Sequence, residues 1–78
     1  MKLPRDVSGQ QIVRVLRHLG YEVVRQKGSH IRMRHNGPPT HYATVPNHDP
    51  VKAGTLHGIL SEVSQAQTIA LEKLIEML

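Results

Sequence analysis

Residues 28–35 of this chain, Gly-Ser-His-Ile-Arg-Met-Arg-His, constrain its fold more than any other segment because charged and apolar side chains alternate along them. Successive side chains of a β-strand point to opposite faces of a sheet. One face of such a strand holds His30, Arg32 and Arg34, and the other holds Ile31, Met33 and His35. An imidazole beside two guanidiniums on an open sheet face is a candidate site for binding and cleaving a phosphodiester.

Chain length limits what this strand can belong to. The sequence has 78 residues, which predicts one domain over residues 1–78 with a small core. It has no Phe or Trp and only two tyrosines, Tyr21 and Tyr42, so aliphatic side chains must fill the core.

The chain has no cysteine, which fits a reducing cytosol and leaves neither disulfides nor thiolate metal sites. No apolar run approaches the ~18 residues of a membrane span, and the first residues lack the apolar region of a signal peptide. We therefore expect a soluble, cytoplasmic protein with no membrane partner.

Positive charge is concentrated in the first half of the chain. Residues 1–35 contain eight Lys or Arg and two acidic residues, whereas residues 36–78 contain two and four. Because the basic half includes the Gly28-Ser29-His30 segment, a polyanion partner such as RNA or DNA is favoured. The competing interpretation is that basic surfaces are common in small soluble proteins.

A capping-box pattern at Ser8–Gln11 precedes apolar residues with helical spacing and predicts a first helix that ends before Gly20. Strands are then expected at 21–26, 30–35 and 41–45, with a tight turn at Gly28-Ser29 and turn residues at 36–39. A second helix is expected near Gly54 with Thr55 as its N-cap, and a third from a capping box at Ser64–Gln67.

These elements predict an α+β fold of α-β-β-β-α order, with helices on one face of a three-stranded antiparallel sheet. The helices should cover the Ile31/Met33 face and leave His30, Arg32 and Arg34 exposed. A register slip of one residue would reverse this assignment. The apolar stripe over 69–78 is wider than a small sheet needs, so it either packs on the second helix or is partly covered by a partner.

Three short motifs in this order carry a family resemblance. They are Gly28-Ser29-His30, then Val45-Pro46-Asn47-His48, then Gly54-Thr55-Leu56 followed by Ile59-Leu60. Together they resemble the HicA (YcfA-like) mRNA interferase toxins of toxin–antitoxin pairs, over about residues 8–78. The resemblance implies a fold similar to double-stranded-RNA-binding domains, ribonuclease activity on mRNA without a cofactor, and neutralisation by a HicB-like antitoxin.

The resemblance also implies that His30 is the catalytic residue. A neutral imidazole can take the proton of an RNA 2′-hydroxyl near neutral pH. Arg32 and Arg34 can stabilise the charge that develops on the phosphate, while Gly28 permits close backbone approach and Ser29 offers polar groups. With Lys27 and His48, these four residues make up the candidate RNA-binding set.

Several roles stay open at this point. His30 could simply be a solvated polar residue, and His48 could act as an acid, contact RNA or order its loop. For Lys52, a phosphate contact and plain solvation are equally credible. Residues His18 and His57 are expected to be surface polar residues, and the spacing of the six histidines predicts no metal site.

Two further functions compete with a ribonuclease. One is a non-catalytic RNA-binding module that uses the same basic face for shape recognition. The other is a protein-interaction domain whose only partner is an antitoxin-like protein.

Overall fold

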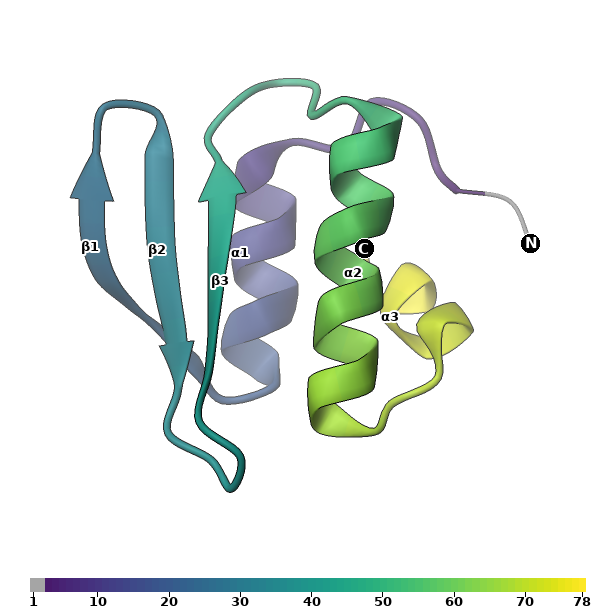
Figure 1. Cartoon of the computed structure of the whole chain (residues 1–78). Helices are drawn as coiled ribbons and strands as arrows, with labels where there is room; N and C mark the ends of the chain where they lie inside the picture. Colours follow the sequence, from purple (N-terminus) through teal and green to yellow (C-terminus); the bar gives the residue numbers. More distant parts are fainter. Residues whose placement is uncertain (1–2) are drawn as a thin grey trace.

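The computed structural model describes residues 3–78, which form one three-stranded antiparallel sheet and three helices (Figure 1). The elements in chain order are α1 (Gly9–His18), β1 (Tyr21–Lys27), β2 (His30–His35), β3 (His41–Pro46), α2 (Ala53–Gln67) and α3 (Leu71–Met77). Strand β2 lies between β1 and β3. Helix α1 packs against β1 and β3, α2 packs against β3, and α3 packs against α2. The α+β fold predicted from the sequence is confirmed.

Helix α1 begins as the capping box predicts. The Ser8 hydroxyl accepts a hydrogen bond from the Gln11 backbone N–H at 3.2 Å, and the Gln11 side chain accepts one from the Ser8 N–H at 2.9 Å. The helix is followed by Gly20, whose φ of +101° lies in a region that suits glycine. This glycine turns the chain into β1.

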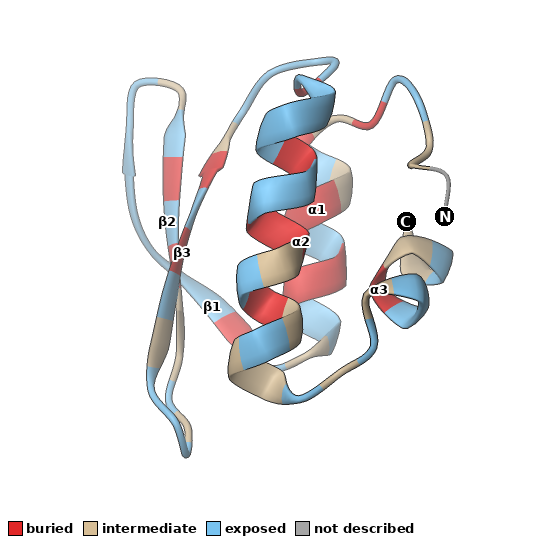
Figure 2. Cartoon of the chain, turned by 45° about the vertical axis from the view of Figure 1, so that its right-hand side comes forward, coloured by how far each residue is buried: buried red, intermediate tan, exposed pale blue. Residues whose placement is uncertain are grey.

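Aliphatic side chains make up most of the core, as the composition requires, and Met33 and Tyr21 are buried with them. Buried residues of α1, α2 and the sheet belong to one hydrophobic cluster. Figure 2 marks buried residues in red on the ribbons of these elements. Ile31 and Met33 of β2 are 3% and 0% exposed. They pack with Ile12 and Leu16 of α1 and Leu60 of α2 in one cluster. The predicted assignment of the β2 faces is therefore correct.

Strand β1 contains an irregularity that the sequence did not reveal. The pairing with β2 runs regularly from Tyr21↔His35 to Val23↔Met33, then shifts so that Arg25 lies opposite Arg32. The extra residue is a β-bulge, and it reverses the alternation of every residue that follows it. Without it, Arg25 would share the inward face of Tyr21; with it, Arg25 shares the outer face of Arg32.

The second helix starts within one residue of the expected Gly54, but its predicted N-cap, Thr55, was wrong. Helix α2 begins at Ala53 with Lys52 as its N-cap, and Thr55 lies within the first turn. The segment just before the helix is held by a distant part of the chain, because the Val51 N–H donates to the Val7 carbonyl at 2.7 Å and the Val51 side chain is buried. That tertiary anchor sets the start of α2 earlier than the local pattern indicated.

The predicted capping box at Ser64 was also wrong, since α2 continues through it to Gln67. The Ser64 hydroxyl donates to the Ile69 carbonyl, and the Ile69 N–H donates to the Ser64 carbonyl at 3.0 Å. Ser64 therefore closes the end of α2, where Thr68 has a left-handed φ of 55°. Helix α3 starts only at Leu71.

The C-terminal apolar stripe packs against the rest of the core. Leu74 is fully buried in the cluster that includes α1 and α2. Its neighbours Ile69, Leu71, Ile75, Met77 and Leu78 are partly buried against the same cluster.

Candidate functional site

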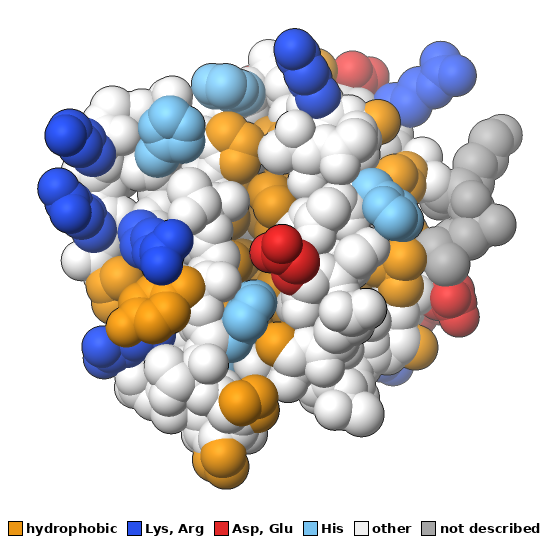
Figure 3. All heavy atoms as spheres, viewed as in Figure 1, with side chains coloured by type: hydrophobic (Ala, Val, Ile, Leu, Met, Phe, Trp, Pro, Cys, Tyr) orange, Lys and Arg blue, Asp and Glu red, His pale blue; other side chains and the backbone are white. Residues whose placement is uncertain are grey.

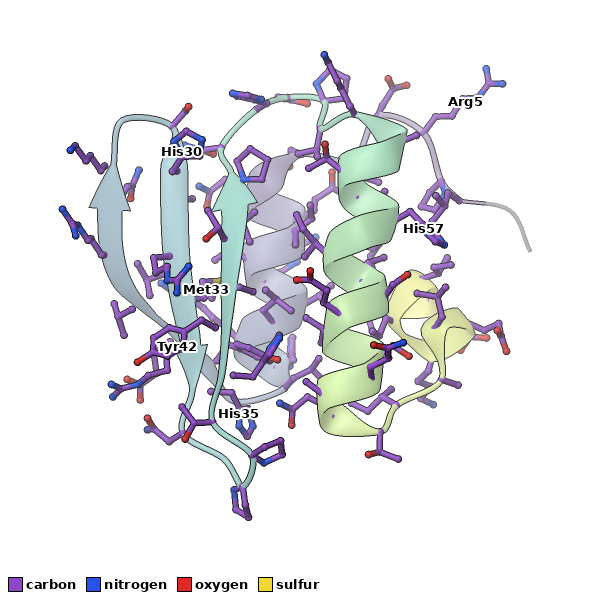
Figure 4. All side chains as sticks on the ribbon, viewed as in Figure 1. Arg5, His30, Met33, His35, Tyr42 and His57 are labelled. Carbon is purple, nitrogen blue, oxygen red and sulfur yellow. The ribbon has the colours of Figure 1, made fainter. Side chains whose placement is uncertain are left out.

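The outer face of the sheet presents the side chains expected from the alternation in β2. His30 and Arg32 are exposed, and Arg34 is half-buried. Arginine and lysine side chains gather over this face, with histidine side chains at its upper end (Figure 3). His35 lies at the opposite end of the sheet from His30 (Figure 4).

The bulge in β1 adds two cations to this face. Arg25 pairs with Arg32, and Lys27 pairs with His30 across the β1–β2 ladder. Directly opposed residues on one face of an antiparallel pair have Cβ atoms about 5 Å apart. The imidazole of His30 is thus flanked on the β1 side by positive charge.

Two shallow hollows meet at His30. The first has a volume of about 490 Å³ and is lined by Arg25, Lys27, Gly28, His30, Arg32 and Thr44. The second has a volume of about 410 Å³ and is lined by His30, Thr44, Pro46, His48, Val51, Lys52 and Thr55. His30 and Thr44 belong to both, so the imidazole stands between a basic hollow over the sheet and a second one at the start of α2.

The loop that carries His48 is held by the backbone of neighbouring segments. The Asn47 N–H donates to the Ser29 carbonyl at 2.6 Å, and the Gly9 N–H donates to the His48 carbonyl at 2.9 Å. A Cβ on Gly9 would lie 2.9 Å from the Asn47 Cα and still closer to the Pro46 carbonyl oxygen. Only glycine lets α1 begin this close to the loop.

Arg32 is positioned by two contacts on the outer face. Its guanidinium donates to the Thr44 hydroxyl at 3.1 Å, and its Cζ lies 4.7 Å from the centroid of the Tyr42 ring. The guanidinium therefore rests between β3 side chains and lines the first hollow.

The turn between β1 and β2 uses its two residues differently. Gly28 has φ of +58°, which a two-residue hairpin turn commonly needs at its first position. No protein atom lies within 4 Å of the Cβ that another residue would add there. The positive φ, rather than a lack of space, therefore favours glycine at this position. Ser29 is half-buried and ties the turn to Asn47 through its carbonyl.

The structure thus brings most of the candidate set together. His30, Lys27, Gly28 and Arg32 line the first hollow, and His48 lines the second. Arg34 lies farther along the outer face, opposite Glu22 and Tyr42, and is not among the residues lining either hollow.

Four polar residues lining the hollows were not in the candidate set: Arg25, Thr44, Lys52 and Thr55. Alternation in β3 would have placed Thr44 on the outer face, because it pairs with Arg32. The position of Arg25 depends on the bulge, and those of Lys52 and Thr55 depend on how α2 approaches the sheet.

A separate polar cluster lies at the other end of the sheet. The Tyr21 hydroxyl accepts from the Gln67 amide at 3.2 Å and lies 2.6 Å from His41 Nδ1. The Tyr21 ring also meets the His35 ring edge-on, with centroids 5.1 Å apart. Burial raises the pKa of Tyr21 above its ordinary value of 10.0. These contacts connect β1 to β2, β3 and α2.

The part of the chain that the structure describes has neither a cluster of candidate metal ligands nor a membrane span. No group of three or more His, Asp or Glu side chains within residues 3–78 is arranged to hold a metal ion. None of the helices there is long and apolar enough to cross a membrane. The exposed His18 and His57 lie on α1 and α2, respectively, and line neither hollow.

Comparison with known proteins gives one match. A family model described as HicA toxin of bacterial toxin–antitoxin matches residues 9–66. This range includes α1, the whole sheet, both hollows and nearly all of α2. Neither the curated proteins nor the solved structures gave a match.

Proposed function

Because this chain belongs to the HicA toxin family of bacterial toxin–antitoxin systems, we propose that it is a metal-independent endoribonuclease that cuts mRNA in the cytoplasm. In this proposal residues 1–78 form one HicA-like domain, and His30 is the catalytic base. The observation that carries it is the position of His30 between two hollows that also contain cationic side chains.

The proposed reaction begins at the ribose. Neutral His30 takes the proton of a 2′-hydroxyl, and the 2′-oxygen attacks the adjacent phosphorus while the bond to the 5′-oxygen breaks. The products are a 2′,3′-cyclic phosphate and a 5′-hydroxyl. The leaving oxygen takes up a proton, for which His48 in the second hollow and water are the candidate donors.

Cations around His30 supply the electrostatic part of this mechanism. Arg32 is already held by Thr44 and Tyr42, so little reorganisation is needed for it to face a phosphate. Lys27 lies opposite His30 on β1, and Lys52 lines the second hollow. Among the described residues, the linings of the two hollows include no Asp or Glu, which favours a polyanionic substrate.

The remaining candidate residues hold the RNA in this proposal. Arg34 extends the positive face beyond the hollows. Gly28 and Ser29 present the turn backbone to the phosphates, and His48 contacts RNA from the loop after β3.

Membership of a toxin–antitoxin family implies an antitoxin partner. We propose that this partner is HicB-like and that it inhibits the toxin by covering the His30 face. This mode of inhibition requires only that the antitoxin exclude RNA from the two hollows.

Growth and cleavage assays test the proposal together. Expression of the unmodified chain should arrest growth, and the purified protein should cut single-stranded RNA in EDTA, whereas His30→Ala should do neither. His57→Ala is the matched control, because His57 is exposed on the side of α2 that faces away from the sheet (Figure 4). It should behave like the unmodified protein.

A non-catalytic RNA-binding module is the alternative function, because the same cations suffice to hold a phosphate backbone. It predicts that RNA stays intact in these assays while binding is retained. An absence of RNA binding at both low and high salt would instead favour a domain that contacts only its antitoxin.

A further inference from the structure

One of the two aromatic side chains faces solvent beside the candidate site. Tyr42 in β3 is 44% exposed, in contrast to Tyr21, which is 2% exposed and bonded within the fold. The Tyr42 ring extends from β3 across the face of β2 (Figure 4). Core packing therefore does not account for an aromatic residue at this position.

The ring is physically connected to the His30 site through Arg32. The Arg32 guanidinium lies 4.7 Å from the ring centroid and also lines the hollow that contains His30. Flat guanidinium groups and aromatic rings are the two protein surfaces on which unpaired bases stack.

The spacing along the sheet suits an extended nucleotide chain. On the outer face, the pairs His30↔Pro46, Arg32↔Thr44 and Arg34↔Tyr42 form three successive rows. Rows on one face are separated by two residues, or about 7 Å, so Tyr42 lies ~14 Å from the His30 row. A strand with a phosphate at His30 would pass the Arg32 guanidinium before reaching the ring.

We propose that Tyr42 and Arg32 form a stacking site for a nucleobase of single-stranded RNA, near but not at the cleaved bond. The inference rests on the proposed function and adds a base-binding subsite to it. Bases of a duplex are stacked on one another and cannot lie flat on a side chain. The substrate segment that crosses this face is therefore single-stranded.

Binding of an uncleavable probe tests the subsite. The probe is a short single-stranded RNA that carries 2′-O-methyl groups and so lacks the attacking hydroxyl. Tyr42→Leu should weaken binding roughly 5- to 150-fold, the range expected for one base–aromatic stack. Tyr42→Phe keeps the ring and should change the affinity by less than about 2-fold.

Salt dependence separates stacking from charge. Tyr42→Leu should weaken binding by the same factor at low and high salt, because it removes no cation. Lys27→Gln should instead make the negative slope of log affinity against log salt less steep, because it removes a cation. A Tyr42→Leu variant that binds as tightly as the unmodified chain would overturn the proposal.

A fluorescence signal provides an independent test. The chain has no Trp, so Tyr42→Trp introduces a single indole at the subsite. Single-stranded RNA should quench its emission, whereas inorganic polyphosphate, which has charge but no bases, should not. Equal quenching by both would contradict base stacking. Failure of the proposed function is recognised separately, because the unmodified chain would then leave ordinary RNA uncut, whatever the effect of the Tyr42 variants on binding of the uncleavable probe.

Discussion

Replacing Arg25 and Lys27 together with glutamine tests whether the bulge in β1 builds the RNA-binding face. The bulge moves both residues to the outer face, opposite Arg32 and His30. In a regular strand, Arg25 would share the inward face of Tyr21 and could not contact RNA bound over β2. The double variant therefore removes two of the cations proposed to contact RNA.

The expected magnitude comes from counting these cations. Arg25, Lys27, Arg32, Arg34 and Lys52 lie on the outer face or line the hollows beside it. If each neutralises one phosphate of a single strand, log affinity falls with log salt with a slope of about −3.5, and removing two cations lowers its magnitude to about 2.1. A fourfold rise in salt should then weaken binding by roughly 100-fold for the unmodified chain and roughly 20-fold for the variant.

A control variant matches the change in net charge. Arg14 and Arg17 are exposed on α1, which packs against the covered face of the sheet. Replacing them with glutamine lowers the formal net charge from +4 to +2, as the first double variant does. Fluorescence anisotropy with a 2′-O-methyl RNA at several salt concentrations gives each slope. Equal slopes for the two double variants would contradict an RNA-binding face built by the bulge, because binding would then follow net charge rather than position.

Two predictions concern the stability of the fold. Gly9→Ala should lower the free energy of unfolding, measured in urea, by about 1–3 kcal/mol through overpacking. The control Gly58→Ala should be neutral or stabilising, because no atom lies within 4 Å of its added Cβ. Equal effects of the two substitutions would contradict the close approach at Gly9. In a Tyr42→Phe background, Tyr21 should ionise at higher pH when folded than in urea, since burial raises its pKa. Burial of the neutral Tyr21 side chain therefore stabilises the fold fully below the unfolded pKa of about 10, and this stabilisation is lost as pH rises through the folded pKa. Identical ionisation midpoints for Tyr21 in the folded and the urea-unfolded protein would argue against its burial.

Local patterns were sufficient where one interaction dominates. The strand His30–His35 has the predicted bounds and faces, because alternating charged and apolar residues can bury only one set. The start of α1 was predictable for a similar reason, since both hydrogen bonds of its capping box lie within four residues.

Tertiary contacts decided the features that the sequence did not reveal. Val23 and Val24 are both good β-formers, so nothing local indicates that the pairing shifts between Val23 and Arg25. Thr55 and Ser64 both resemble N-caps, yet one lies in the first turn of α2 and the other closes its end.

The candidate site was predictable along β2 but not across the fold. Thr44 follows from alternation once β3 is paired with β2. Lys52 reaches the same hollow as His30 only because the loop after β3 is anchored at Gly9 and Ser29. Contacts between segments this far apart in the chain have no local sequence signal.

The chemistry of the RNA ends tests whether His30 is the catalytic base. Purified protein and its His30→Ala variant are incubated with single-stranded RNA in EDTA, and the ends of the fragments are identified by mass spectrometry. Attack by a 2′-hydroxyl predicts fragments with 2′,3′-cyclic phosphate and 5′-hydroxyl ends from the unmodified protein and none from the variant. Fragments with 3′-hydroxyl and 5′-phosphate ends, or undiminished cleavage by His30→Ala, would contradict the assignment of His30 as the base.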